Sequence, residues 1–74
     1  MKYNVTKHLL EMLLKRNIIE EDVCYCLDNY HSDYPNKGHA GCHYYVGKVK
    51  GKNLKVLVNT TNWNIITAFW LDSQ

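Results

Sequence analysis

Apolar residues recur every three or four positions near the start of the chain, which is the period of a helix with one buried side. This pattern predicts a helix from Thr6 to about Arg16. Thr6 suits the N-cap because its hydroxyl can accept a backbone hydrogen bond, and Asn17 suits the helix end because asparagine can adopt the left-handed conformation. Three consecutive acids favour a new helix N-terminus, so we predict a second helix over Glu20–Asn29.

The period changes to two from Cys42 onward, and this alternation is typical of strands with one buried face. We predict an antiparallel meander of three strands over Cys42–Lys50, Leu54–Asn59 and Ile65–Leu71, joined by two turns. The segment Tyr30–Gly41 contains the only proline and two glycines, so we predict a loop there. Met1–Val5 is a candidate for a fourth, short edge strand.

Together these elements predict one α+β domain over residues 1–74, with two N-terminal helices packed on a three- to four-stranded antiparallel sheet. The last strand is apolar on both faces, with Ile65, Phe69 and Leu71 on one face and Ile66, Ala68 and Trp70 on the other. Such a strand is central, covered on both sides, or part of a contact surface. We therefore expect Phe69 or Trp70 to meet a protein partner or a second copy of the chain in a homodimer.

Lysines and acids are separated along the chain, although the formal net charge is only +2. The acids gather on the second predicted helix, at Glu20, Glu21, Asp22 and Asp28. The predicted hairpin carries four lysines without an acid among them, Lys48, Lys50, Lys52 and Lys55. A basic hairpin beside an acidic helix is compatible with an anionic partner such as RNA, and equally with a plain solvated surface.

The hydropathy and cysteine content bear on where the protein works. No run of the sequence approaches the ~18 apolar residues of a membrane-spanning helix, and the first residues lack the apolar stretch of a signal peptide. Three cysteines are an odd number, which does not suit a closed disulfide framework and favours a reducing compartment. We expect a cytoplasmic protein without membrane association.

Three residues spaced four apart, His8, Met12 and Arg16, form a stripe along the first predicted helix. On a helical wheel that starts at Val5 they fall at roughly 300°, 340° and 20°. Arg16 is therefore expected in the middle of the apolar arc, where a cation must snorkel, find a partner or belong to a site. His8 is expected on the rim of this arc.

The same stripe carries a resemblance to a known family. The chain has His8, Glu11, Arg16 and Ile18, then Glu21-Asp22-Val23, and later Ile65-Ile66-Thr67. It resembles a bacterial and phage domain of unknown function with a helical H-A-x-x-R-M-x-x-R-G-I-x-x-x-D-V signature and a C-terminal V-V-T-V-Y strand. The resemblance covers about Thr6 to Trp70. That family is similar to the RelE-like and barnase–EndoU–colicin group of small ribonuclease toxins.

This resemblance implies a metal-independent endoribonuclease, the toxin of a toxin–antitoxin pair, with His8, Arg16 and Thr67 as its catalytic residues. A histidine can move protons near neutral pH, and an arginine can hold the phosphate in a bidentate way. Met12 stands in place of one signature arginine. This departure leaves a second hypothesis open, in which the chain is a catalytically degenerate module of the same fold that binds an antitoxin, another protein or itself.

Other residues are candidates for RNA binding. Lys48, Lys50 and Lys52 could follow the phosphate backbone, and Tyr44 or Tyr45 could stack on a base. Each candidate also has a structural interpretation. His8 can be a plain surface residue, Arg16 can stabilise the helix C-terminus, and Thr67 suits a strand. The tyrosines and tryptophans can be packing residues.

The cysteines and histidines are numerous enough to suggest zinc, but their spacing argues against it. Cys24 and Cys26 are two apart on a predicted helix and point about 200° apart. Cys42 and His43 are adjacent on a predicted strand and face opposite sides. A zinc site would need one ligand from each pair, for instance Cys26 and His43 together with His39 across the loop. We expect no metal and no cofactor, with the cysteines acting as small apolar residues.

We expect the purified protein to contain no stoichiometric zinc, and a chelator to leave its thermal unfolding unchanged, because the cysteines pack rather than ligate. Elemental analysis and a melting curve with and without EDTA measure both quantities. Roughly one zinc ion per chain would contradict this prediction.

Overall fold

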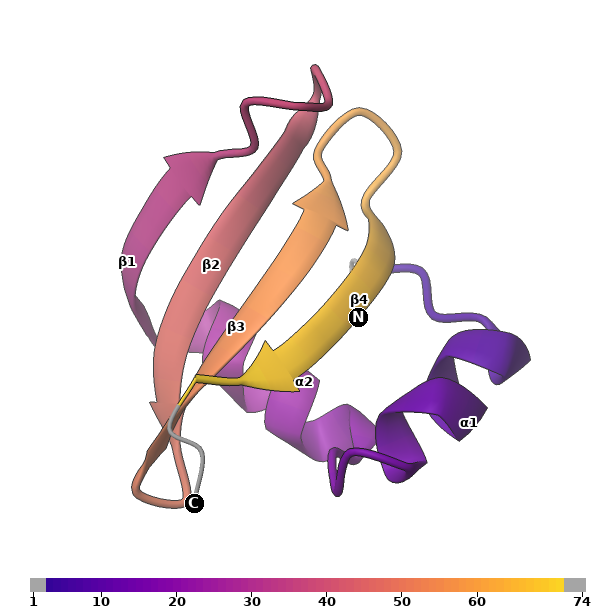
Figure 1. Cartoon of the computed structure of the whole chain (residues 1–74), viewed down its shortest axis with the longest axis vertical. Helices are drawn as coiled ribbons and strands as arrows, with labels where there is room; N and C mark the ends of the chain where they lie inside the picture. The colour runs from indigo at the N-terminus through magenta and orange to yellow at the C-terminus, as the bar shows by residue number, and fades with distance from the viewer. Residues whose placement is uncertain (1–2, 72–74) are drawn as a thin grey trace.

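The computed structural model describes residues 3–71 of the 74-residue chain. Two helices, α1 (Lys7–Leu14) and α2 (Glu20–Asp28), precede the strands β1 (Tyr30–Pro35), β2 (Cys42–Val49), β3 (Lys52–Asn59) and β4 (Asn64–Trp70). The strands form one antiparallel sheet in the order β1-β2-β3-β4 (Figure 1). The predicted α+β arrangement of two helices followed by an antiparallel meander is confirmed.

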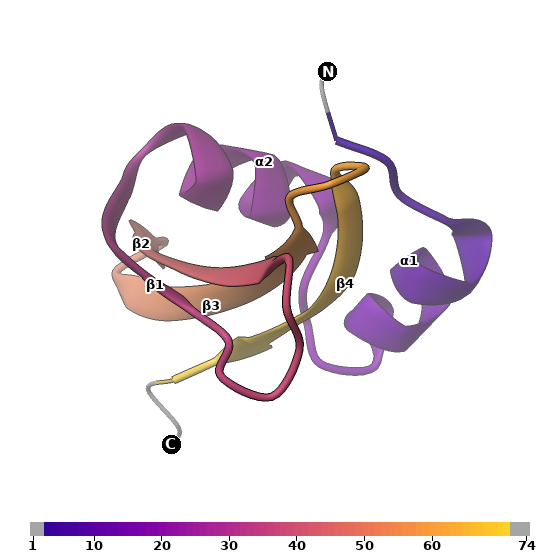
Figure 2. The same ribbon diagram turned by 90° about the horizontal axis from the view of Figure 1, so that it is seen from above.

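Helix α2 lies across β2 and β3 on one side of the sheet, and α1 lies beside the edge strand β4 (Figure 2). Alternate residues of β3 form the centre of the core, and Leu54, Val56 and Val58 are fully buried there. Strand geometry places the intervening side chains on the opposite side. We call that side the open face, since no helix of residues 3–71 covers it. Its side chains include Tyr34, Tyr44, Val46, Lys48, Lys55, Leu57, Thr67 and Phe69.

Helix α2 lies very close to β2, and Gly47 permits this approach. A Cβ atom at Gly47 would lie 3.0 Å from the carbonyl oxygen of Cys26 and 3.2 Å from Cα of Tyr30. No side chain fits at such distances without a shift of the backbone. The glycine therefore sets the spacing between the helix layer and the sheet.

Helix α1 ends two residues earlier than predicted, so Arg16 lies in the turn after the helix rather than on its apolar stripe. Asn17 adopts the left-handed conformation, with φ 63°, and the backbone N–H of Ile18 donates to the carbonyl of Leu13. This closure turns the chain so that Ile18 becomes fully buried. The helical period of apolar residues alone does not reveal that the helix ends at Leu14, because this end accompanies the burial of Ile18.

The prediction of a loop over Tyr30–Gly41 is wrong in its first half, where β1 pairs with β2. All six residues of β1 are exposed, so their sequence lacks the apolar alternation of a half-buried strand. Pro35 is tolerated because β1 is an edge strand and needs fewer backbone donors. The first residues do not supply the fourth strand. Asn4 makes a single parallel bridge to Asn64, and Met1 and Lys2 lie outside the described residues.

A β-bulge in β4 changes which residues share a face. The register shifts opposite Leu57 and Val58, and Ile66 is the extra residue. Ile65, Ala68 and Trp70 therefore face the helices, whereas the prediction grouped Ile65 with Phe69. The expectation that Phe69 and Trp70 lie on opposite faces is confirmed. Strand β4 is an edge strand with helices on one side only.

The tip of the β2–β3 hairpin is attached to the start of α2 by Asp22, which is buried. One carboxylate oxygen accepts from the backbone N–H of Ile19 at 3.2 Å, and the other lies 3.2 Å from Nζ of Lys50. Lys50 and Gly51 have φ values of 53° and 81°, as the tight two-residue turn of a twisted hairpin requires. Asp22 thus caps α2 and holds the hairpin at once.

None of the helices within residues 3–71 is both long and apolar enough to cross a membrane.

We expect Asp22→Ala to lower the free energy of unfolding by about 1–2 kcal/mol, because the N-terminus of α2 loses its cap. Asp22→Asn should lose less, since its amide oxygen can still accept from Ile19. Glu21→Ala, an exposed acid of the same helical turn, is the matched control and should change stability by less than about 0.5 kcal/mol. Urea unfolding of the three variants measures these differences, and equal losses for Asp22→Ala and Glu21→Ala would contradict the capping role.

Candidate functional site

Arg16 reaches the outer edge of β4 and contacts Thr67 there. Its Nη1 atom donates to Oγ1 of Thr67 and to the carbonyl of Ala68, both at 2.9 Å. In the other direction, Nε1 of Trp70 donates to the carbonyl of Arg16 at 3.0 Å. Hydrogen bonds donated in both directions thus hold the turn after α1 against β4. The structure brings together two of the three residues suggested as catalytic.

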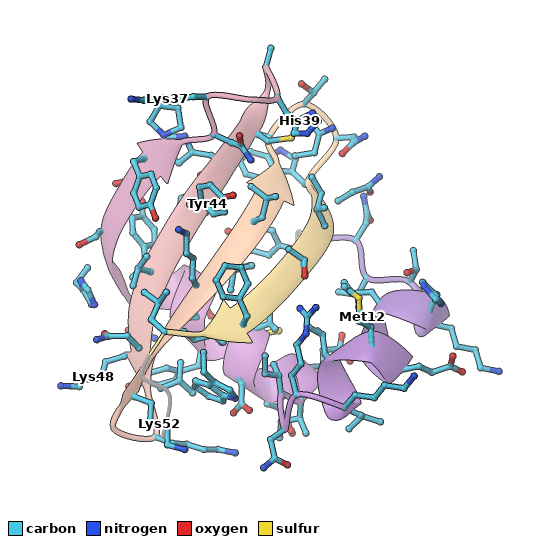
Figure 3. The ribbon with its side chains drawn as sticks, viewed as in Figure 1. Met12, Lys37, His39, Tyr44, Lys48 and Lys52 are labelled. Carbon is cyan, nitrogen blue, oxygen red and sulfur yellow. The ribbon has the colours of Figure 1, made fainter. Side chains whose placement is uncertain are left out.

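His8 is exposed in the first turn of α1. Within residues 3–71 no hydrogen bond or ion pair joins it to Arg16 or Thr67. Met12, one turn further along, is half-buried and packs against the core (Figure 3). The position that carries an arginine in the helical signature therefore contributes to packing in this chain.

Three of the four lysines of the basic hairpin lie at one end of the sheet but face different surroundings. Lys48 pairs with Asn53 across the strands and faces the open side. Nζ of Lys50 is held by Asp22, and Nζ of Lys52 lies 5.7 Å from the centre of the Trp70 ring. Lys50 and Lys52 line a pocket of about 320 Å³ beside Leu14, Asn17, Ile19 and Trp70. Figure 3 shows Lys48 and Lys52 at this same end.

The two tyrosines proposed for base stacking lie on opposite faces of β2. Tyr45 faces the helices and packs against the core, with its ring centre 4.8 Å from that of Tyr30. Burial, as the largest cause, raises the pKa of its hydroxyl. Tyr44 lies on the open face (Figure 3). Its hydroxyl accepts from Nδ2 of Asn36 at 3.2 Å, and its ring lies 5.2 Å from that of Tyr34.

The most distinctive cluster was not predicted from the sequence and is centred on Lys55. Its Nζ atom lies 4.1 Å from the ring centre of Tyr44, 4.9 Å from that of Tyr34 and 5.8 Å from that of Phe69. These distances are within the range of cation–π attraction. The rings come from β1, β2 and β4, so the cluster depends on the strand order. The alternation of β3 does indicate that Lys55 points away from Leu54 and Val56.

The open face carries no acid on any of the four strands. Asp33, the one acid of β1, points to the other side and lies 2.7 Å from Nε2 of His43. The remaining acids of the described part belong to the two helices. Lys55 and its three rings thus lie on the side of the sheet whose strands carry no acid.

The sequence model of a protein family matches residues 5–70. The chain belongs to the family Domain of unknown function (DUF4258). The match includes both helices, all four strands and every candidate residue named above, so the site lies within the DUF4258 domain. No curated protein and no solved structure matches the chain.

The cysteines of this DUF4258 domain do not form a recognisable metal site. Cys26 is fully buried against Gly47, and its Sγ donates to the carbonyl of Leu54 at 3.3 Å. Burial raises the pKa of its thiol to about 11. Within residues 3–71 no group of three histidines, cysteines or acids is arranged to hold a metal ion.

The raised pKa of Cys26 predicts a loss of stability at high pH. The thiol ionises near pH 9 in the unfolded chain and near 11 in the folded one, so its contribution is complete below about 9 and is lost as the pH rises through about 11. Urea unfolding at several pH values should show a shallower decline for Cys26→Ala. A second check is Ellman's reagent on a Cys24→Ser/Cys42→Ser variant, in which Cys26 should react only after denaturation. Rapid labelling of the folded variant would contradict its burial.

Proposed function

We propose that this protein is a small RelE-like ribonuclease that binds RNA and cleaves it without a metal ion, as the toxin of a toxin–antitoxin pair. The observation that carries the proposal is the contact of Arg16 with Thr67 at the edge of β4. Arg16 and Thr67 are 51 positions apart in sequence, and the fold brings their side chains into contact. A protein that acts on RNA in this way would work in the cytoplasm.

The contact leaves Arg16 prepared to bind a phosphate. A guanidinium has five N–H donors, and the two bonds to β4 within the described residues both use Nη1. The Nε and Nη2 donors remain for the paired oxygens of a phosphate. The planar group is held in one orientation before substrate binds, which lowers the entropy cost of binding. Thr67 would orient the guanidinium and contribute its hydroxyl to the phosphate.

His8 would move the proton. In cleavage without a metal, the 2′-hydroxyl would lose its proton to His8, its oxygen would attack phosphorus, the bond to the 5′-oxygen would break, and that oxygen would take up the proton from His8. The products are a 2′,3′-cyclic phosphate and a 5′-hydroxyl. Histidine suits this role because it titrates near neutral pH. Arg16 would stabilise the charge that develops on the phosphate. The hairpin residues Lys48, Lys50 and Lys52 would attract the flanking backbone.

A second candidate function, a binding module without catalysis, is favoured by Met12. In the helical signature this position is an arginine, and here it packs against the core. With one cation fewer, the same fold would bind an antitoxin or another protein. The half-exposed ring of Phe69 on the open face, rather than the core-packed Trp70, would then meet the partner or a second copy.

We expect the wild-type protein to cleave RNA in the presence of EDTA and to leave 2′,3′-cyclic phosphate ends. His8→Ala should reduce the rate roughly a hundredfold or more with an unchanged melting temperature, because an exposed histidine contributes little to the core. Arg16→Lys should be impaired to a similar degree, since a point charge cannot hold a phosphate in two places. His39→Ala, an exposed loop histidine, is the matched control and should stay fully active. RNA left intact by the wild-type protein would reject the enzyme and favour the binding module.

A further inference from the structure

We propose that the open face of the sheet binds the unpaired bases of single-stranded RNA, with Lys55 and its three surrounding rings as the binding surface. The inference rests on the proposed function and names the form of RNA that the site accepts. The surface is defined by Tyr34, Tyr44, Lys55 and Phe69. None of these four residues is among the suggested catalytic groups.

The first argument is that the rings form a packed layer without any helix above them. Val46 and Leu57 lie on the open face, yet only 6% and 7% of their surface is exposed. The side chains around them therefore cover the sheet on this side. Tyr34 itself keeps 41% of its surface exposed. The result is a layer of rings that is fixed below and accessible above, and such rings suit the stacking of bases.

The second argument is the charge. Lys55 places an ammonium group among the rings, and Lys48 adds another cation on the same face. The open face has no acid on its four strands, whereas the helix side carries Asp22, Asp28 and Asp33. A ligand that combines aromatic groups with negative charge fits this face. A second copy of the chain docked on this face would place its own lysines against Lys48 and Lys55, and the like charges would repel each other.

The third argument is continuity with the phosphate site. Thr67 and Phe69 are two apart on β4 and both point to the open face. Side chains at this spacing lie about 7 Å apart on one face of the strand, so Phe69 is the next side chain along the open face from Thr67. A strand with its phosphate at Arg16 would therefore place its next bases over Phe69 and Tyr44. Duplex RNA cannot bind in this way, because its bases are already stacked and paired.

The test measures binding separately from cleavage. The probe is a fluorescent 2′-O-methyl RNA of about eight nucleotides, which lacks the attacking hydroxyl and cannot be cut. Fluorescence anisotropy should give saturable binding of the single strand, and the matching duplex should bind at least about tenfold more weakly. Tyr34→Leu should weaken single-strand binding about tenfold, since one stacking ring is lost. Tyr25→Leu, an exposed tyrosine of α2, is the matched control and should bind like the wild type.

Lys55→Met separates charge from packing because methionine keeps the apolar stem. It should lower affinity and reduce the slope of log affinity against log salt by about 0.7, the amount expected for one phosphate contact. Tyr34→Leu should leave that slope unchanged. Lys7→Met removes a lysine from α1 and is the control for net charge. Thermal unfolding by circular dichroism verifies that each variant is folded.

The outcomes distinguish this inference from the proposed function. If the wild type binds the uncleavable strand but does not cut RNA, the ribonuclease is rejected and the binding surface stands. If RNA is cut while Tyr34→Leu and Lys55→Met bind like the wild type, the surface is rejected and the enzyme stands. Equal affinity for duplex and single strand also rejects it. A dimer in sedimentation that Phe69→Ala dissociates would show that the face binds a second copy instead.

Discussion

A four-stranded sheet has two faces, and residues 3–71 contain only two short helices to cover them. Helix α2 lies on one side, over β2 and β3, and α1 packs beside β4, so that both contribute to the one core cluster that includes the alternate residues of β3. The other side must therefore be closed by the side chains of the sheet itself. Tyrosines, a phenylalanine and the stem of a lysine can do this, because they have large apolar surfaces and polar ends that remain in water. The proposed RNA-binding surface thus follows from the placement of the helices away from this face.

The edge strand β4 poses a second constraint, since its outer backbone groups have no neighbouring strand. Arg16 donates to one of these groups, the carbonyl of Ala68. The backbone N–H of Ile65 donates to the carbonyl of Asn4. These contacts protect the edge against pairing with other chains. Arg16 is in this way both an edge-protecting residue and the proposed phosphate ligand. The contacts that protect the edge of β4 thereby also hold the guanidinium in the position of its proposed role.

The elements with strong periodicity were predictable. Strands β2 and β3 alternate clearly, and α2 begins with three acids, so their positions follow from local patterns. Strand β1 was missed because none of its residues is buried and its pairing depends on β2. The left-handed stop of α1 at Asn17 was predicted correctly, whereas the last helical residue, Leu14, lies two residues before the predicted Arg16. Among the site residues, the contact of Arg16 with Thr67 was anticipated through a family resemblance. The Lys55 cluster was not anticipated, because its three rings come from three other strands. One of these strands is β1, which was itself missed.

The strand order has a consequence for how the protein folds. Each strand pairs with the strand next to it in sequence, so the sheet can form by closing three successive hairpins. Because the loops are short, closing each hairpin costs little conformational entropy. The mean sequence separation between contacting residues is therefore low for a protein built on a sheet. The helices precede the sheet and connect to it directly only through β1. They can dock once β2 and β3 present a continuous apolar surface, with Gly47 leaving room for α2. The meander thus allows the sheet to form rapidly, and the side chains of the open face come together as the strands pair.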